Sequence, residues 1–249
     1  ARKRAENVQD IPVSIRAVDA EMIQRQDISG LEKLAAKAPE LIIARSSNGS
    51  GASLTIRGVG SNFSSVGVEQ SVAVIVDGAY YGHGRTIDEG FFDLARVEVL
   101  KGPQALFFGK NATAGVVSIT TADPGDTFEG LARVGYEFRS QSVYAEAVAS
   151  GPISDTLGIR VALRGSKMFG GYTHNLATQA FYNTIDVATG NVAALAAAPA
   201  DRDQPGTKDL IGRVTLKWTP TENLTNTLKV SRTHSRGGAS GFSTILGCA

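Results

Sequence analysis

The residues most able to do chemistry gather in "VEVLKGPQALFFGKNATAGVVSI", residues 97–119. A Gly-Lys pair among small residues raises the question of a phosphate-binding loop, which needs the spacing G-x-x-x-x-G-K-[ST]. Here six residues separate Gly102 from Gly109. Asn111 stands where Ser or Thr should be, and Pro103 has no amide proton to donate. The stretch therefore fails as a nucleotide loop, and we predict an architectural role for it.

No other catalytic or metal-binding pattern is present. The stretch has no G-x-S-x-G elbow, no His-Glu-x-x-His and no carboxylate pair. His83, His174 and His234 are too scattered to propose a metal site, and the single cysteine, Cys248, excludes an internal disulfide and any multi-cysteine site. We predict no catalytic residue, no cofactor and no bound metal.

Composition narrows the class of protein. The chain has 249 residues, of which 42% are hydrophobic, enough for a packed core. The net charge is +1 without a long basic run, so there is no footprint for nucleic acid. No apolar run reaches the roughly 18 residues of a membrane helix, whereas the strands of a membrane barrel carry only an alternating signal. Because the chain begins without Met, we expect a fragment.

The first half predicts a mixed α and β domain. In "SGLEKLAAKAPEL" Ser29 precedes Glu32 at the capping-box spacing, and the following leucines and alanines have helical periodicity until Pro39. These apolar residues are expected in the core. A tight Gly-Pro turn and a short helical piece from Gln104 to Phe108 are expected before the last strand. The expected strands are 11–18, 53–58, 71–78, 95–102 and 115–121.

After residue 125 apolar and polar residues alternate over segments long enough to cross an outer membrane. The five segments are 131–139, 143–150, 157–167, 210–218 and 224–233. Tight turns are expected at 151–156 and 219–223, and a long loop at 169–207, which favours a membrane barrel over a soluble sandwich. Five strands cannot close a barrel. Either more chain follows in the natural protein, or the barrel interpretation is wrong.

The stretch "LARVEVLKGPQALFFGKNATAGVVSITT" closely resembles the plug signature of TonB-dependent outer-membrane receptors. Four further blocks resemble that family in order, "IPVSIRAVDAEMI", "LEKLAAKAPEL", "LTIRGVGSN" and "VAVIVDGAYYG". "ASGPISDTLGIRVALRG" is similar to the start of the family's barrel. The resemblance implies a plug domain at residues 1–125 and the N-terminal part of a 22-stranded β-barrel, about five strands, at 126–249.

The resemblance also implies a function. Such receptors sit in the outer membrane of Gram-negative bacteria, in contact with its lipid, with the plug inside the barrel lumen and facing the periplasm. They capture a scarce ligand, most often a ferric siderophore, and import it with energy from the TonB complex. The TonB box that binds TonB is expected upstream of residue 1.

Individual residues follow from the same resemblance. Arg57 and Lys101 match basic positions that meet glutamates on the barrel wall, with Lys101 in place of the commoner Arg and without its two-pronged fork. Glu98 joins them as a plug–barrel clamp, although an ion pair with Arg96 within the plug is an equal alternative. Asp77-Gly78 is interpreted as a turn. The candidate ligand-facing residues are Asn62, Phe63, Tyr80, Tyr81, His83 and Arg85.

Alternatives stay open at this point. The same kind of transporter could import cobalamin, an oligosaccharide or an aromatic compound. A signal-transducing receptor would carry an extra N-terminal domain upstream of residue 1. A nucleotide-binding enzyme, indicated by nothing but the Gly-Lys pair, is disfavoured by the motif spacing.

Overall fold

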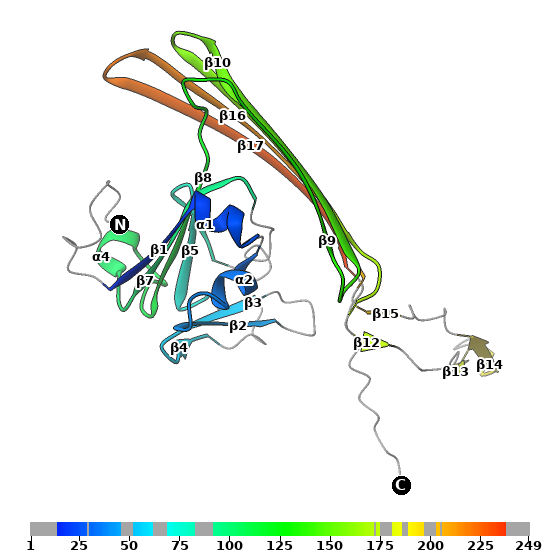
Figure 1. The fold of residues 1–249 in the computed structure, drawn as a ribbon. Coiled ribbons are helices and arrows are strands. Elements are labelled where there is room, and N and C mark those ends of the chain that lie inside the picture. Colours follow the sequence, from blue (N-terminus) through cyan, green and yellow to red (C-terminus); the bar gives the residue numbers. More distant parts are fainter. Residues whose placement is uncertain are drawn as a thin grey trace. The chain divides into compact units, whose positions relative to one another are not determined.

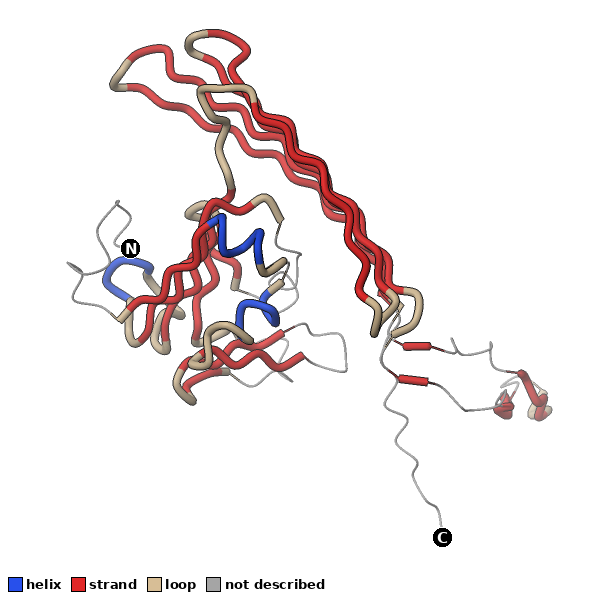
Figure 2. Tube along the Cα trace, viewed as in Figure 1, coloured by secondary structure: helices blue, strands red, loops and turns tan. Residues whose placement is uncertain are grey.

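The computed structural model describes most of the chain as two compact units. The first unit holds 1–130, 148–162 and 212–231, and the second holds 131–147, 163–211 and 232–249. Figure 1 draws the elements in sequence colours and Figure 2 shows the same trace by secondary structure. The described residues are 14–28, 30–45, 52–61, 69–82, 92–171, 173–174, 181–185, 189–196, 203–204 and 206–237.

The centre of the first unit is a five-stranded sheet, called here the mixed sheet, with the order β1-β7-β8-β5-β6. Strands β5 and β8 run parallel, and the other neighbours are antiparallel. The predicted strand 115–121 is confirmed residue for residue, and the others are confirmed with shifted ends. The bounds are β1 Ile15–Asp19, β5 Val72–Val76, β6 Ala79–Tyr81, β7 Leu94–Lys101 and β8 Gly115–Thr121.

Three short helices accompany this sheet, α1 (Ala20–Arg25), α2 (Leu31–Ala35) and α4 (Ala105–Phe108). Helix α1 was not predicted; the Asp19 carboxylate caps it by accepting from the Met22 amide at 2.8 Å. Helix α4 confirms the predicted helical piece. No helix in the described part of the chain is long and apolar enough to span a membrane.

Helix α2 is shorter than the predicted helix. Its N-cap is Gly30, which offers no side chain, and Ser29 lies outside the described residues. The last turn tightens, with the Lys37 amide donating to the Leu34 carbonyl, before Pro39 ends the helical path. Its apolar residues are nevertheless in the core as predicted, since Leu31 and Leu34 are buried.

A three-stranded antiparallel sheet, β2-β3-β4, adjoins helix α2. Its strands are β2 (Leu41–Arg45), β3 (Ala52–Ile56) and β4 (Val59–Gly60). The sequence predicted β3 but not β2. Between the two sheets and the helices lies the larger core, to which alternate residues of the mixed sheet contribute. The members of that core include Val18, Ile23, Leu34, Leu54, Val72, Val74, Val97, Val99, Val117 and Ile119.

The mixed sheet is buried on both faces. Ala73 and Ile75 of β5 and Val116 of β8 belong to a second, smaller cluster on the face opposite the larger core. Such two-sided burial explains why the sequence of β5 is a continuous apolar run rather than an alternation.

A second five-stranded sheet, called here the long sheet, has the order β17-β16-β11-β10-β9 and contributes residues to both units. The five predicted segments are all strands; β9 is shifted by two residues at the predicted length, and the other four are longer than predicted. The predicted turns 151–156 and 219–223 are wrong in length, because the strands continue until two-residue turns at 155–156 and 222–223. The bounds are β9 Glu129–Glu137, β10 Ser142–Ser154, β11 Leu157–Met168, β16 Thr207–Thr221 and β17 Leu224–Gly237.

Burial in the long sheet is inverted relative to a water-soluble sheet. On one face polar side chains are hidden, with Glu146 5% and Thr215 1% exposed. On the other face apolar side chains are open, with Val134 80% and Val230 60% exposed. A soluble antiparallel sheet buries its apolar face.

The long segment between β11 and β16 holds two small antiparallel pairs among its described residues. One pairs β12 (Thr173–His174) with β15 (Asp203–Gln204), and the other pairs β13 (Phe181–Ile185) with β14 (Val192–Ala196). The predicted loop 169–207 is therefore partly strand.

Candidate functional site

The stretch 97–119 contains the end of β7, a closed connection at 102–114 and the first residues of β8. Gly102 and Gly109 have φ values of 82° and 78°, and Asn111 has 67°, conformations that Gly and Asn adopt at least cost. The Gln104 amide donates to the Ala112 carbonyl at 2.8 Å, and the Gly102 amide donates to the Ala114 carbonyl at 3.1 Å. These amides are occupied within the turn, which agrees with the predicted architectural role.

Asn111 links this turn to the start of β5 and to β6. Its Nδ2 donates to the Tyr80 hydroxyl at 2.8 Å and also to the Glu69 carboxylate. Lys110 pairs with Glu69 at 2.8 Å. Partial burial and the charge of Glu69 raise the pKa of the Tyr80 phenol. The hydrogen bond from Asn111 and the charge of Lys110 lower it, but their combined effect is smaller. The cluster fixes the Tyr80 ring in place.

The candidate ligand-facing residues are described in part. Tyr80 is held by Asn111, and Tyr81 is partly buried against the larger core. Asn62, Phe63, His83 and Arg85 lie outside the described residues. No group of three His, Cys, Asp or Glu that could hold a metal occurs in the ranges that the structure describes.

Each of the three predicted clamp residues contacts another residue of the first unit. Lys101 Nζ lies 2.9 Å from Glu40 Oε1, an ion pair. Arg57 donates to the Ser14 hydroxyl at 3.4 Å. Arg96 Nε lies 3.4 Å from Glu98 Oε1, the internal pair that the sequence left as an alternative.

The Lys101–Glu40 pair predicts a pH-dependent stability. Burial raises the pKa of Glu40, but Lys101, the backbone and Arg16 together outweigh it and hold that pKa below its ordinary 4.5. The stabilisation is therefore present above about pH 4.5 and is lost as the pH falls through the lower folded pKa. Lys101→Met is expected to cost about 1 to 3 kcal/mol at pH 7, between an exposed and a buried pair, and less at pH 3.

Urea unfolding of residues 1–125 at both pH values measures this difference. The matched control is Lys110→Met, which removes a pair that is far more exposed, with 72% of the Lys110 side chain open. It is expected to change the unfolding midpoint little. An equal loss for Lys101→Met at both pH values would contradict the assignment to Glu40.

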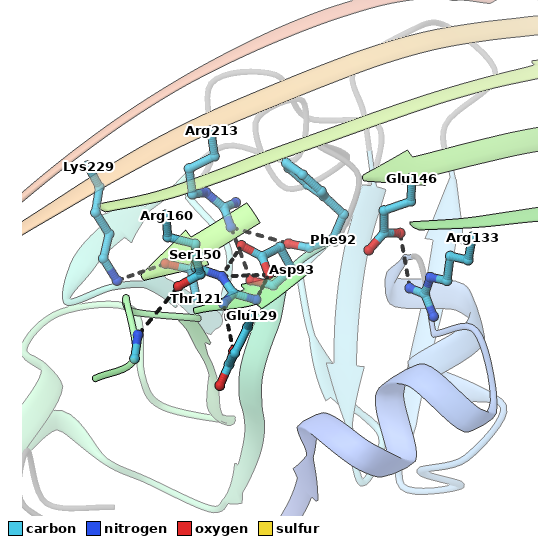
Figure 3. A network of polar contacts seen from close by, with 11 residues as sticks. Phe92, Asp93, Thr121, Glu129, Arg133, Glu146, Ser150, Arg160, Arg213 and Lys229 are labelled. Carbon is cyan, nitrogen blue, oxygen red and sulfur yellow. Dashed lines mark hydrogen bonds and ion pairs between the residues drawn. The ribbon is translucent and has the colours of Figure 1, made fainter. Parts of the chain in front are cut away.

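Basic side chains of the long sheet contact acidic positions beside the mixed sheet, a feature that the sequence did not predict (Figure 3). Arg160 of β11 grips Asp93 through Nε, 3.0 Å from both carboxylate oxygens, and through Nη2, 2.6 Å from Oδ1. Both side chains are largely covered, at 12% and 4% exposed. A paired, fork-like contact of this kind is among the stronger polar interactions in proteins.

Arg213 of β16 contacts the same short segment through its backbone. Its Nη1 donates to the carbonyls of Phe92 at 3.2 Å and Asp93 at 3.3 Å. Its guanidinium also lies 4.9 Å from the centre of the buried Phe92 ring, a cation–π distance. Residues 92 and 93 are thus held by two neighbouring strands.

Lys229 of β17 makes a third contact. Its Nζ lies 2.8 Å from Thr121 Oγ1, 3.2 Å from Asp77 Oδ1 and 2.8 Å from Asp123 Oδ1. Asp77 and Gly78 form the predicted turn, with φ values of 48° and 86° between β5 and β6. The Asp77 carboxylate also accepts from the Thr121 amide and hydroxyl, which joins the turn to the end of β8.

The second unit has a polar cluster of its own on the long sheet. One carboxylate oxygen of Glu146 accepts from Arg133 at 3.0 Å and from Arg164 at 2.9 Å. The Arg164 guanidinium lies 4.5 Å from the centre of the Tyr144 ring. These contacts join β9, β10 and β11 and satisfy the buried Glu146, whose side chain is 2% exposed.

Comparisons with known proteins give one family. Residues 7–116 match the family model "TonB-dependent Receptor Plug Domain". The chain is 32% identical over 147 residues to the pesticin receptor of Yersinia pestis, covering 58% of this chain and 21% of that receptor. It is 29% identical over 153 residues to the hemin receptor of Yersinia enterocolitica, covering 60% of this chain and 20% of that receptor.

A solved structure agrees with the sequence comparisons. The crystal structure of the ferric yersiniabactin uptake receptor FyuA from Yersinia pestis superposes with a TM-score of 0.67 and 26% identity, covering 90% of this chain and 32% of that receptor. The chain thus spans about a fifth of the length of the curated relatives that it matches. These relatives are receptors and not enzymes, and this chain contains a plug domain of the TonB-dependent receptor family at residues 7–116, followed by strands that match the fold of such a receptor.

Proposed function

We propose that this chain is the plug, residues 1–125, and the first wall strands, residues 126–249, of an outer-membrane receptor that imports a ferric siderophore into the periplasm. The observation that carries the proposal is the inverted burial of the long sheet. Its open apolar face suits lipid, and its polar face carries the contacts to Asp77, Phe92 and Asp93. Further strands would complete the 22-stranded barrel that the family resemblance implies.

The two ends of the long sheet support a membrane setting. Trp218 lies on the apolar face near the turn at 222–223. Tyr136, near the end of β9, and Phe138, in the turn at 138–141, are in edge-to-face contact at 5.0 Å at the opposite end of the strands. Membrane barrels place aromatic girdles at both interfaces of an apolar band.

The identity of the cargo is inferred from relatives. Two relatives are named for iron-bearing ligands, hemin and ferric yersiniabactin. Their names favour import of iron over import of cobalamin, an oligosaccharide or an aromatic compound. Energy would come from TonB through a box upstream of residue 1, and a signalling domain there would add induction. Arg57, Glu98 and Lys101 as a clamp to later wall strands, and the six candidate ligand-facing residues, belong to this proposal.

Growth under iron limitation tests the cargo. Source cells with and without the full gene are compared on a panel of ferric siderophores and hemin, with iron-replete medium as the control. We expect loss of growth on one iron source and normal growth in iron-replete medium. Normal growth on every iron source, with a defect on cobalamin or a sugar, would keep a transporter and reject iron as its cargo.

A further inference from the structure

Three neighbouring strands of the long sheet each give one cation to the plug. The strand order β17-β16-β11 places Lys229, Arg213 and Arg160 in a row on the polar face. Their contacts converge where β5, β7 and β8 meet at one end of the mixed sheet, at Asp77, at residues 92–93 and at residues 121–123. We propose that this row, the plug seat, holds the carboxyl-terminal end of the plug against the wall. In the predicted Arg57–Lys101 clamp the plug supplies the cations, whereas in the seat the wall supplies them. In the seat, the plug supplies the carboxylates.

The three contacts differ in strength. The side chains of Arg160 and Asp93 are largely covered and paired through several atoms, so solvent screens their charges little. Arg213 donates hydrogen bonds to two backbone carbonyls and lies over an aromatic ring, so these contacts do not require a carboxylate. Lys229 is partly open, as are Asp77 and Asp123, so its contacts weaken in salt. The contacts of the seat at residues 92–93 are therefore expected to be insensitive to salt, and those at the β5–β6 turn to weaken as salt rises.

Geometry separates the seat from the predicted clamp. Asp93 immediately precedes β7, and Lys101 is its last residue, eight strand residues later. At about 3.3 Å per residue the two positions lie roughly 25 Å apart along the strand. The seat therefore holds the end of β7 that is farther from the Lys101–Glu40 pair, and loss of one contact does not remove the other.

The test compares two arginines of β11 in the complete receptor, purified in detergent. Arg160 and Arg164 lie on the same face and both pair with a carboxylate, but the partner of Arg164 is Glu146 of the wall itself. We expect Arg160→Gln to raise the rate at which a broad-specificity protease cleaves the plug by about 10-fold or more, because it leaves a buried charge unpaired. Arg164→Gln is expected to leave plug cleavage unchanged. Arg160→Lys should restore part of the protection.

Two further comparisons keep the result interpretable. Asp93→Asn should match Arg160→Gln, and the double variant should be no worse than either, as expected for a direct pair. Lys229→Gln should raise cleavage at low salt and have little effect at about 1 M salt, unlike Arg160→Gln. Equal cleavage in the Arg160→Gln and Arg164→Gln proteins, or additive effects of Asp93→Asn and Arg160→Gln, would overturn the seat.

The seat rests on the proposed receptor but fails separately from it. Protease cleavage needs no ligand, so it is readable even if no iron source depends on the gene. Leakage of a large antibiotic into cells that carry Arg160→Gln is a second readout, and we expect more leakage than with Arg164→Gln. If leakage stays at the level of the unaltered receptor while the protease result holds, the seat survives, but it does not keep large solutes out of the lumen.

Discussion

Gly115→Ala is expected to lower the free energy of unfolding of the plug by about 3 kcal/mol or more, a large part of the roughly 5 to 15 kcal/mol typical of a domain. Gly115 begins β8 between β5 and β7, paired with Val72 and Lys101. A Cβ there would lie 2.4 Å from the Leu100 carbonyl oxygen and 2.8 Å from Ile56 Cδ1. The carbonyl belongs to the neighbouring strand, so relief would require the sheet to separate at its centre.

The matched control is Gly109→Ala in the same turn. Gly109 has φ of 78° and open space around its Cα, so alanine there meets backbone strain alone, about 1 to 2 kcal/mol. Urea unfolding of residues 1–125 compares the two. Equal losses for both variants would show that backbone conformation, and not the close approach of Leu100, decides the need for glycine at residue 115.

Much of the plug was predictable because its signals are local. The sequence of β8 alternates between two buried faces and ends in threonines, and the Gly-Pro turn before α4 is fixed by residues that control φ. Asp77-Gly78 is a two-residue hairpin signal, and the structure confirms the turn. Helix α1 was missed because six residues give too short a periodic pattern, and its capping Asp19 looks like the end of the preceding strand.

The contacts of the site were not predictable because they join distant positions. Arg160 and Asp93 are 67 residues apart, and Lys229 and Asp77 are 152 apart. The alternation of apolar and polar residues puts Arg160, Arg213 and Lys229 opposite the apolar residues of their strands. It could not choose their partners, since any carboxylate of the plug satisfies the same charge rule. A cation recurring on the polar face of three strands was the available signal. Only the order of the strands in the sheet shows that the three cations lie side by side.

The inverted long sheet leads to the second large effect. Val230→Arg, near the middle of β17, is expected to reduce assembly of the receptor in the outer membrane severely. In water an exposed valine can become arginine within about 0.5 kcal/mol. In lipid an added arginine costs up to about 2 to 4 kcal/mol, the value at the bilayer midplane. Val230 is 60% exposed on the apolar face, so solvent and lipid predict opposite outcomes.

Thr233→Arg is the matched control, because Thr233 is also exposed on β17 but lies on the polar face by the alternation of the strand. Both variants carry the same added charge and the same β-propensity change of a branched residue. The amount of folded receptor in outer-membrane fractions measures the effect. A strong loss for Val230→Arg with near-normal levels for Thr233→Arg would place the apolar face in lipid. Normal amounts of both variants in the outer membrane would show that the exposed valines and leucines of the long sheet do not face lipid. Another part of the protein would then have to cover them.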